Sequence, residues 1–185
     1  MGLMDLMPNR PRGLGIDIST GMIHQAKIRL KSSNLRDRVV FRQENAEELS
    51  SISQETIDFA FCVGAFEHML DKKAVLCQVQ HALKPKTRFL CLTHNGDSFW
   101  NKYISPYLNI TNTHLSTDKC LDKEEITRLV HGSGYESLEF GYWSFIPKGD
   151  IRFPLGPALQ SMDFIGKLIK WRSLREGLFF LANKY

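Results

Sequence analysis

The chain contains 185 residues, of which 43% are hydrophobic and 24% are charged, and its formal net charge is +4. A chain of this length hides roughly 70% of its unfolded surface on folding, so we expect one globular domain over 1–185 rather than two. The sequence has no low-complexity tract or internal repeat, which argues against a disordered or repetitive architecture. The basic residues are dispersed except near the carboxyl end, so nucleic-acid binding is not expected.

Cysteine usage and hydropathy indicate the compartment. The four cysteines have no Cys-x-x-Cys spacing, and three of them lie in strongly apolar runs, so we expect reduced core residues in an intracellular protein. No apolar stretch approaches the roughly 20 residues that span a bilayer, and the amino terminus lacks the layout of a signal peptide. These features predict a cytoplasmic protein.

The first part of the chain predicts three strands and one helix. An apolar run over 14–18 predicts a strand, and apolar residues at helical spacing over 22–30 predict the helix that follows it. Short apolar runs over 39–41 and 57–63 predict two further strands. The last of these is apolar on both faces, which is typical of a strand in the middle of a covered parallel sheet.

A second helix is expected after Asp71, whose side chain can cap it. The Lys84-Pro85 pair is expected to end this helix, because proline disfavours helical geometry at the residue before it. A fourth strand is predicted over 89–93. The apolar stripe of the helix consists of Val75, Val79, Ala82 and Leu83.

A third helix is predicted after Asp122, which is followed three residues later by Glu125 in a capping-box pattern. Gly132 or Gly134 is expected to end it. Alternating aromatic and small residues over 135–145 then predict a strand.

The carboxyl end predicts an antiparallel hairpin with a helical insertion. The insertion, or lid, is expected over 147–176, with a helix at 159–169, and the last strand at 178–182. Strands that alternate with helices predict an α/β fold, so the whole chain is expected to be one layered domain with an elaborated carboxyl end.

Three segments, in this order, carry a resemblance to a known family: GIDIS over 15–19, ENAEEL over 44–49 and IDFAFCVGAFEH over 57–68. They resemble the class I, Rossmann-like S-adenosylmethionine-dependent methyltransferases. The resemblance implies a Rossmann-like sheet with helices on both faces. In that family a first strand and a Gly-x-Gly-x-Gly turn precede the acidic strand, and residues 1–13 contain neither. The resemblance therefore implies an N-terminally truncated fold whose missing first strand would lie between the strands at 14–18 and 57–63.

The resemblance also implies a binding site for S-adenosylmethionine at the carboxyl ends of the strands, where open α/β sheets bind their ligands. Asp17, with Ile18, would accept hydrogen bonds from the ribose hydroxyls, although Asp17 could instead cap the next helix. Asn45 and Ala46 would face the adenine, although they could form only a solvated turn.

The segment after the central strand is the most specific match of the chain to this family. The resemblance implies that Cys62, Val63 and Gly64 line the pocket of the methionine portion of the donor. Glycine at this point would let the backbone approach a ligand closely, and backbone carbonyls at the strand end could hold the methionine amino group.

Two histidines are candidate catalytic residues. His68 could be a base or a substrate contact, or the Glu67-His68 pair could only order its turn. His114 lies in a Thr-His element that the resemblance places near the mouth of the active site. Histidine suits general base catalysis because its unperturbed pKa of roughly 6.5 leaves it mostly neutral at physiological pH. No metal site is expected, because the neighbouring residues His94, Asp97, His114 and Asp118 match no ligand spacing.

One turn departs from the family pattern. Lys86 and Thr87 stand where relatives usually have two glycines after Leu-Lys-Pro. The turn geometry must therefore differ, or be strained if a left-handed residue is required there.

Two functional hypotheses remain. The first is an enzyme that transfers a methyl group from S-adenosylmethionine to a small, lipid-like or quinone-like acceptor. The second is a degenerate or truncated, non-catalytic interaction module that has lost the donor site, which the absent glycine turn and Lys86 favour. An unrelated nucleotide-binding oxidoreductase is disfavoured, since its glycine fingerprint would also stand at the front.

The expected partners follow from these hypotheses. A small-molecule acceptor is the first, and a completing chain or a second copy of this chain could supply the missing strand. The mixed apolar and basic segment 155–175 could cover the acceptor or rest on a membrane surface, or it could form a helix packed on the sheet with its lysines solvated.

Overall fold

The computed structural model describes residues 11–99, 102–103, 120–143 and 175–185. Residue contacts divide the chain into two compact units, residues 1–51 and 52–185, and each unit is described by itself. The single domain expected over 1–185 stays a prediction. The expected insertion over 147–176 and its helix at 159–169 lie almost wholly outside the described residues.

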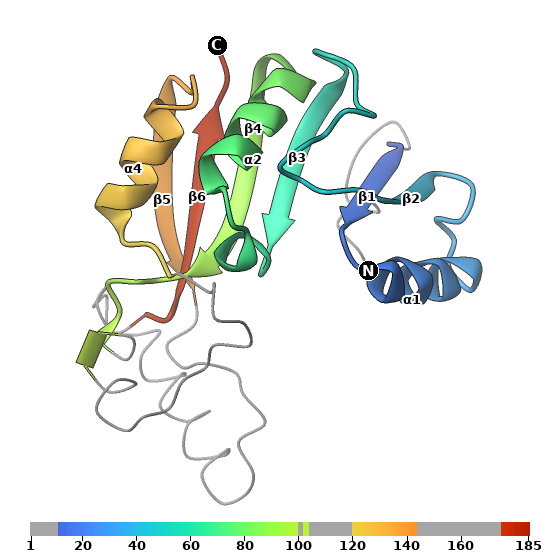
Figure 1. Ribbon diagram of the computed structural model, residues 1–185, viewed down its shortest axis with the longest axis horizontal. Helices are drawn as coiled ribbons and strands as arrows, with labels where there is room; N and C mark the ends of the chain where they lie inside the picture. The colour runs from blue at the N-terminus through green and yellow to red at the C-terminus, as the bar shows by residue number, and fades with distance from the viewer. Residues whose placement is uncertain (1–10, 100–101, 104–119, 144–174) are drawn as a thin grey trace, which may run out of the picture. The chain divides into compact units, whose positions relative to one another are not determined.

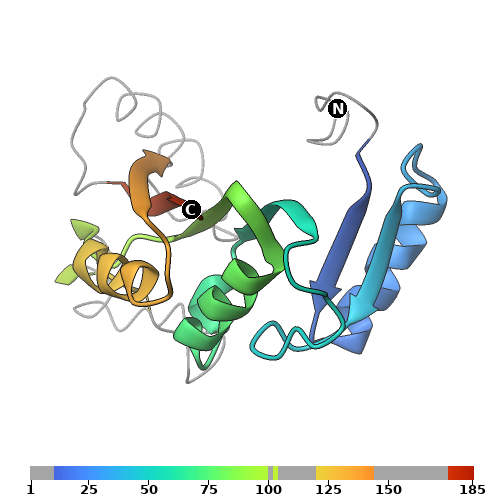
Figure 2. The same cartoon turned by 90° about the horizontal axis from the view of Figure 1, so that it is seen from above.

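The first unit is a parallel strand pair with a connecting helix. Strands β1 (Gly13–Asp17) and β2 (Val39–Gln43) pair in parallel, with Gly13 opposite Val39 and Asp17 opposite Gln43. Helix α1 (Thr20–Lys31) packs along the pair (Figure 2). The predicted strand–helix–strand order is confirmed, and a connecting helix is the usual way to join two parallel strands.

The N-terminal cap of α1 is local. Ser19 is the cap, and its Oγ accepts a hydrogen bond from the backbone N–H of Met22 at 3.3 Å. Asp17 does not cap the helix: its Oδ1 accepts a hydrogen bond from the N–H of Ser19 at 2.8 Å. The alternative expectation that Asp17 caps the helix is therefore wrong, and its carboxylate orders only the turn that leads into α1.

The second unit is a four-stranded mixed sheet in the order β3-β4-β6-β5 (Figure 1). Strands β3 (Ile57–Val63) and β4 (Leu83–His94) are parallel, whereas β6 (Gly177–Asn183) runs antiparallel to both β4 and β5 (Ser137–Trp143). The last two strands therefore form the antiparallel hairpin that the sequence predicts.

Two helices of the second unit, α2 (Lys72–Ala82) and α4 (Lys123–His131), lie on the same face of this sheet (Figures 1 and 2). Between the helices and the sheet lies the core, in which the rings of Phe66 and Phe89 each meet the ring of Phe180 edge-on, with centroids 5.8 and 5.9 Å apart. No helix covers the opposite face within the described part of this unit. The α/β fold with a mixed sheet is confirmed.

Both helix caps predicted in this unit are present. The Asp71 carboxylate accepts the N–H of Ala74 at 2.9 Å, and Asp122 and Glu125 form the reciprocal capping box of α4. The end of α2 differs from the prediction, because Leu83 begins β4 instead of completing the helical stripe. Its partner is Ile57, at the first residue of β3, and an irregularity in the ladder follows this pair.

Of the two alternatives expected for the turn in β4, the structure shows the strained one. Lys86 adopts a left-handed conformation with φ of 60°. A left-handed backbone brings the Cβ of an L-residue too close to the following carbonyl oxygen, at a cost of roughly 1–2 kcal/mol. The two glycines of the family pattern would avoid this cost.

The described strands form two separate sheets, β1-β2 and β3-β4-β6-β5, and no described strand pairs with both. Strand β3 is an edge of its sheet, and its Phe61 and Val63 are 58% and 59% exposed. Because Cys62 packs against the core and side chains alternate along a strand, Phe61 and Val63 point to the opposite face of the sheet. The missing first strand stays a prediction.

Candidate functional site

The first candidate region is the carboxyl end of β3. Val63 is the last residue of the strand and pairs with Leu92, and the N–H of Gly64 donates a hydrogen bond to the Leu92 carbonyl oxygen at 2.9 Å. Gly64 then turns the chain with φ of 60°. A Cβ added at Gly64 would meet no atom within 4 Å, so the space beside this peptide is open.

The turn that follows is built around a buried glutamate. Phe66–His68 form a short 3-10 helix, η2, in which Phe66 and Glu67 are buried. The Oε2 of Glu67 accepts a hydrogen bond from the hydroxyl of Thr93 at 2.9 Å. From the other end, the buried ammonium of Lys72 donates to the carbonyl oxygens of Glu67, at 3.1 Å, and Met69, at 2.8 Å.

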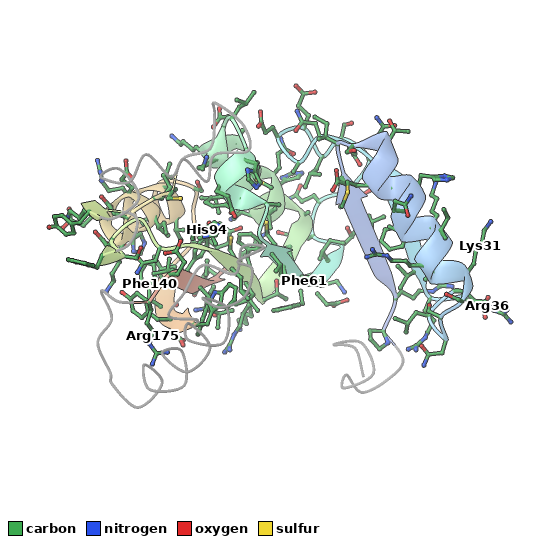
Figure 3. The ribbon with its side chains drawn as sticks, turned by 90° about the horizontal axis from the view of Figure 1, so that it is seen from below. Lys31, Arg36, Phe61, His94, Phe140 and Arg175 are labelled. Carbon is green, nitrogen blue, oxygen red and sulfur yellow. The ribbon has the colours of Figure 1, made fainter. Side chains whose placement is uncertain are left out.

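His94, at the end of β4, lies between two buried carboxylates and is labelled in Figure 3. Its Nε2 lies 3.5 Å from Oε1 of Glu67, and its Nδ1 lies 3.3 Å from Oε1 of Glu176. Each of these two contacts is an ion pair only when the imidazole is protonated. The other oxygen of Glu176 accepts the hydroxyl of Ser98 at 3.1 Å.

This cluster joins η2, the end of β4 and the start of β6 next to the candidate pocket. Sequence reasoning missed it, and considered His94 only as a metal ligand. Glu67 and His94 are separated by a helix and a strand, and Glu176 lies far along the chain. The local signal is limited to position: Glu67 lies four residues after β3, His94 is the last residue of β4, and Glu176 directly precedes β6.

His68 is half-buried, and its backbone N–H donates a hydrogen bond to the carbonyl oxygen of Ala65 at 3.1 Å. The Glu67 carboxylate, which accepts the hydroxyl of Thr93, contributes to the order of this turn. A catalytic role of His68 stays a prediction. His114, the second predicted base, lies outside the described residues.

Two cysteines of adjacent strands are directly opposite each other next to this pocket. Cys62 of β3 pairs in register with Cys91 of β4. A hydrogen bond from the Cys91 thiol, with smaller contributions from the N–H groups of Ala65 and Phe66, lowers the pKa of Cys62 against the opposing effects of burial and of the Glu67 carboxylate. Burial, followed by the interaction with Cys62, raises the pKa of Cys91 well above the usual thiol range.

The second candidate region is the carboxyl edge of the β1-β2 pair in the first unit. Asp17 ends β1, and its backbone carbonyl accepts the N–H of Glu44, which directly follows β2. Only one oxygen of the Asp17 carboxylate, Oδ1, has a hydrogen bond within the described residues. Ile18, whose carbonyl accepts the side-chain amide of Gln43 at 3.2 Å, is exposed.

Asn45 and Ala46 lie directly after Glu44 at the same edge, so the structure brings them to the end of the sheet at which Asp17 stands. The Oδ1 of Asn45 accepts the N–H of Glu47 at 3.0 Å and thereby forms a turn. Hydrogen bonds from the hydroxyl and N–H of Ser51 lower the pKa of the Glu44 carboxyl and keep it ionised.

The predicted residues thus form two groups. Asp17, Ile18, Asn45 and Ala46 share one edge in the first unit, and the segment 62–64 lies at a strand end in the second. Whether both groups border one cavity stays a prediction. The described residues contain no group of three or more histidine, cysteine, aspartate or glutamate side chains placed to hold a metal ion. None of the described helices is both long and apolar enough to cross a bilayer.

Comparisons with known proteins place the chain in a family. A family model described as a methyltransferase domain matches residues 6–134. No match was found among the curated proteins.

Solved structures resemble the chain at low sequence identity. The YcgJ protein from Bacillus subtilis is 14% identical with a TM-score of 0.68, over 94% of this chain and 82% of that one. The [4+2]-cyclase SpnF is 15% identical with a TM-score of 0.66, over 96% of this chain and 67% of that one. Phosphoethanolamine N-methyltransferase 2 from Haemonchus contortus is 18% identical with a TM-score of 0.62, over 92% of this chain but only 43% of that one.

At these identities the structural likeness shows the fold alone. The family model carries the assignment, because it covers well over half of the chain, from before β1 to the end of α4 and its following turn. The chain therefore belongs to the class I S-adenosylmethionine-dependent methyltransferases, whose methyl donor is S-adenosylmethionine.

Proposed function

We propose that the chain binds S-adenosylmethionine at the two strand-end regions and transfers its methyl group to a small, partly apolar acceptor. The observation that carries the proposal is the peptide at Gly64: a left-handed glycine at the carboxyl end of a parallel strand, beside open space and before a turn that buried polar contacts hold. Such a peptide lets a ligand approach the backbone more closely than any side chain would permit.

The residues present fit the donor. When bound, S-adenosylmethionine supplies an electrophilic methyl group on a sulfonium. Asp17 offers a carboxylate oxygen that has no hydrogen bond within the described residues, which suits a ribose hydroxyl. Ala46 offers a backbone N–H for the adenine, and the adjacent Asn45 is held in a turn by its contact with Glu47.

The rest of the reaction needs positioning more than acid–base chemistry. Methyl transfer is a displacement at carbon, and holding the two reactants in line is worth roughly 7–11 kcal/mol. In this proposal the ordered turn η2 forms one wall of the donor pocket. His68 or His114 accepts a proton from any acceptor that must lose one during methylation. The lipid-like or quinone-like character of the acceptor rests on the sequence of the segment 155–175.

The test compares two alanine substitutions at left-handed glycines of the same unit. Gly64 and Gly134 have φ of 60° and 84°, so each alanine introduces a similar backbone strain of roughly 1–2 kcal/mol. Calorimetry with S-adenosylmethionine should show at least about a tenfold loss of affinity for Gly64→Ala, because one methyl group clashing with a ligand costs more than about 1.4 kcal/mol. Gly134→Ala should bind like the unmodified chain. Equal affinities of the two variants would refute the proposed pocket.

A second pair of variants tests the ribose contact. Asp17→Ala should abolish donor binding. Asp37→Ala, which removes an exposed carboxylate that only faces Arg36 in the same unit, should leave binding unchanged. Retained affinity in Asp17→Ala would place the ribose elsewhere.

A non-catalytic interaction module remains the second candidate. The exposed Phe61 and Val63 on the unpaired edge of β3 favour it, because a strand from a completing chain or from a second copy could pair there. Light scattering and calorimetry separate the candidates: a stable assembly without donor binding would support the module, and donor binding with methyl transfer would support the enzyme.

A further inference from the structure

Strands β3 and β4 each carry a cysteine near the carboxyl end, and the proposed methyl transfer uses the chemistry of neither thiol. Cys62 and Cys91 are register partners in adjacent parallel strands, which lie side by side in Figure 1. Register partners of neighbouring strands point to the same face of a sheet. Accordingly, Cys91 lies fully buried in the core and the partly buried Cys62 packs against that core.

The spacing of the two strands suits a covalent bond between these residues. Neighbouring strands lie about 4.8 Å apart, and the Cα atoms of a disulfide are usually about 4.4–6.8 Å apart. A bond between Cys62 and Cys91 therefore needs side-chain rotation but no separation or sliding of β3 against β4.

The two thiols are chemically unequal. The Cys91 thiol donates a hydrogen bond to the sulfur of Cys62, and the N–H groups of Ala65 and Phe66 point at the same sulfur. These donors stabilise a thiolate at Cys62, whereas burial keeps Cys91 protonated. Thiolates, not thiols, are the nucleophiles, so Cys62 is the residue that reacts first and Cys91 is the residue that follows.

We propose that Cys62 and Cys91 form an oxidisable dithiol: peroxide oxidises Cys62 to a sulfenic acid, and Cys91 converts it to a disulfide that joins β3 to β4. This modification site does not depend on the proposed methyl transfer. Only its consequence for donor binding rests on that function.

The reaction balances with peroxide as the oxidant. The Cys62 thiolate attacks one peroxide oxygen, the O–O bond breaks, and hydroxide leaves and takes up a proton to become water. The Cys91 sulfur then attacks the sulfenic sulfur, the S–O bond breaks, and the departing hydroxide combines with the Cys91 proton as a second water. Two thiols are oxidised by two electrons, and one peroxide is reduced.

The disulfide would act on the candidate pocket through the turn. Cys62 stands two residues before Gly64, and its sulfur accepts hydrogen bonds from the N–H groups of Ala65 and Phe66 at the start of η2. A bond to Cys91 withdraws the thiolate from these donors. We therefore expect the oxidised chain to bind S-adenosylmethionine at least about tenfold more weakly than the reduced chain, and reduction to restore the affinity.

The competing interpretation is that these residues are inert core cysteines. It makes the opposite prediction about order of reaction, because Cys77 on α2 is exposed and Cys62 is partly buried. If access alone decided, the exposed Cys77 and Cys120 would react before Cys62. If thiolate stabilisation decides, Cys62 reacts at least about tenfold faster than Cys77 at neutral pH.

The experiment treats the reduced full-length chain with hydrogen peroxide, blocks the remaining thiols with an alkylating reagent and maps the products by mass spectrometry. The expected product has lost two hydrogen atoms, contains a Cys62–Cys91 cross-linked peptide and has an alkylated Cys77. Earlier oxidation of Cys77, or a disulfide that excludes Cys62, would overturn the proposal.

Serine variants separate the two roles. Cys91→Ser should accumulate a sulfenic acid at Cys62, trapped by dimedone, and Cys62→Ser should lose the reaction at both positions. The matched control Cys77→Ser should form the disulfide at the unmodified rate. Circular dichroism checks that each variant is folded, and the order of reaction in the unmodified chain tests the proposal without any variant.

Donor binding provides the last distinction. A disulfide that forms and weakens binding supports both the dithiol and its link to the donor site. A disulfide that forms without changing a measurable affinity refutes the link but not the dithiol, and absence of donor binding in the reduced chain refutes the proposed function while the dithiol stands.

Discussion

Replacing Thr93 by valine tests whether the buried carboxylate of Glu67 depends on its hydroxyl partner. The two residues are 5% and 3% exposed, and the hydroxyl donates to the carboxylate at 2.9 Å. Valine has the shape of threonine, so the substitution removes the donor without opening a cavity. A hydrogen bond to a charged group contributes about 1.5–3 kcal/mol. Because His94 also faces Glu67, we expect the lower half of this range, about 2 kcal/mol.

Urea unfolding measures this loss in the correct unit. All three tryptophans, Trp100, Trp143 and Trp171, belong to the second unit, so tryptophan fluorescence reports the unit that contains Thr93. With a slope of about 2 kcal/mol per molar urea, a loss of about 2 kcal/mol lowers the midpoint by about 1 M. The slope itself should not change.

The same substitution at Thr127 is the control. Its hydroxyl donates to the carbonyl oxygen of Lys123 within α4 at 2.8 Å, a helix carbonyl that is bonded in any case, so Thr127→Val should cost less than about 0.5 kcal/mol. Equal midpoints for the two valine variants would refute the reasoning. A double-mutant cycle with Glu67→Gln should give a coupling of at least about 1 kcal/mol, since the two side chains are in direct contact.

Three further predictions follow from single residues. Lys86→Gly should raise the free energy of unfolding by about 0.5–1 kcal/mol, because glycine relieves the left-handed strain but loses part of that gain to its greater freedom in the unfolded chain. Lys86→Ala should not raise it, and urea unfolding of the second unit measures both variants. Tyr135→Phe should lower the free energy of unfolding by about 1 kcal/mol in the same assay, because the phenol donates a hydrogen bond to the Leu76 carbonyl oxygen at 3.2 Å. Burial raises the pKa of Tyr135, so in an alkaline titration its absorbance should change only when the chain unfolds. The preference of peroxide for Cys62 over Cys77 should shrink as the pH rises past roughly 8.5, where ordinary thiols ionise, because the lowered pKa of Cys62 gives it the larger thiolate fraction only below that pH. Rates of alkylation measured from roughly pH 6 to 9 test this expectation.

Features that depend on local sequence could be predicted. The cap of α2 and the capping box of α4 require only residues three positions apart, and both were expected from Asp71, Asp122 and Glu125. Of the two alternatives for Asp17, the helix cap is wrong, because Ser19, which is also a good capping residue, has that role. Which of them caps the helix depends on where β1 ends, and strand ends are set by pairing with β2.

Features that depend on pairing between distant segments could not be predicted as well as these local caps. The sequence predicts a strand only over 89–93, yet β4 begins at Leu83, because that residue pairs with Ile57. Nothing near Leu83 signals this, since it also continues the apolar stripe of α2. The strand length follows from the partner strand, and the irregularity after Ile57 accommodates the extra residues.

The same distinction between local and long-range features applies to the candidate site. Gly64 could be identified from sequence, because it directly follows a predicted apolar strand and precedes a turn. The contacts that hold that turn could not, because Thr93 and His94 reach Glu67 only through the parallel pairing of β3 and β4, and Glu176 reaches His94 only through the antiparallel pairing of β6.

This arrangement has a consequence for how the pocket can be formed in the free chain. A ligand is bound tightly when the groups that meet it are already in place, since ordering them on binding would cost affinity. The Cβ direction of Gly64 points into open space, so contacts elsewhere in the turn must hold this peptide in position. The buried Glu67 supplies that support through Thr93, and Lys72 supplies it through the backbone carbonyls of η2. Loss of the Thr93 hydroxyl should therefore weaken donor binding as well as stability, although Thr93 itself lies in the core and not at the open side of Gly64.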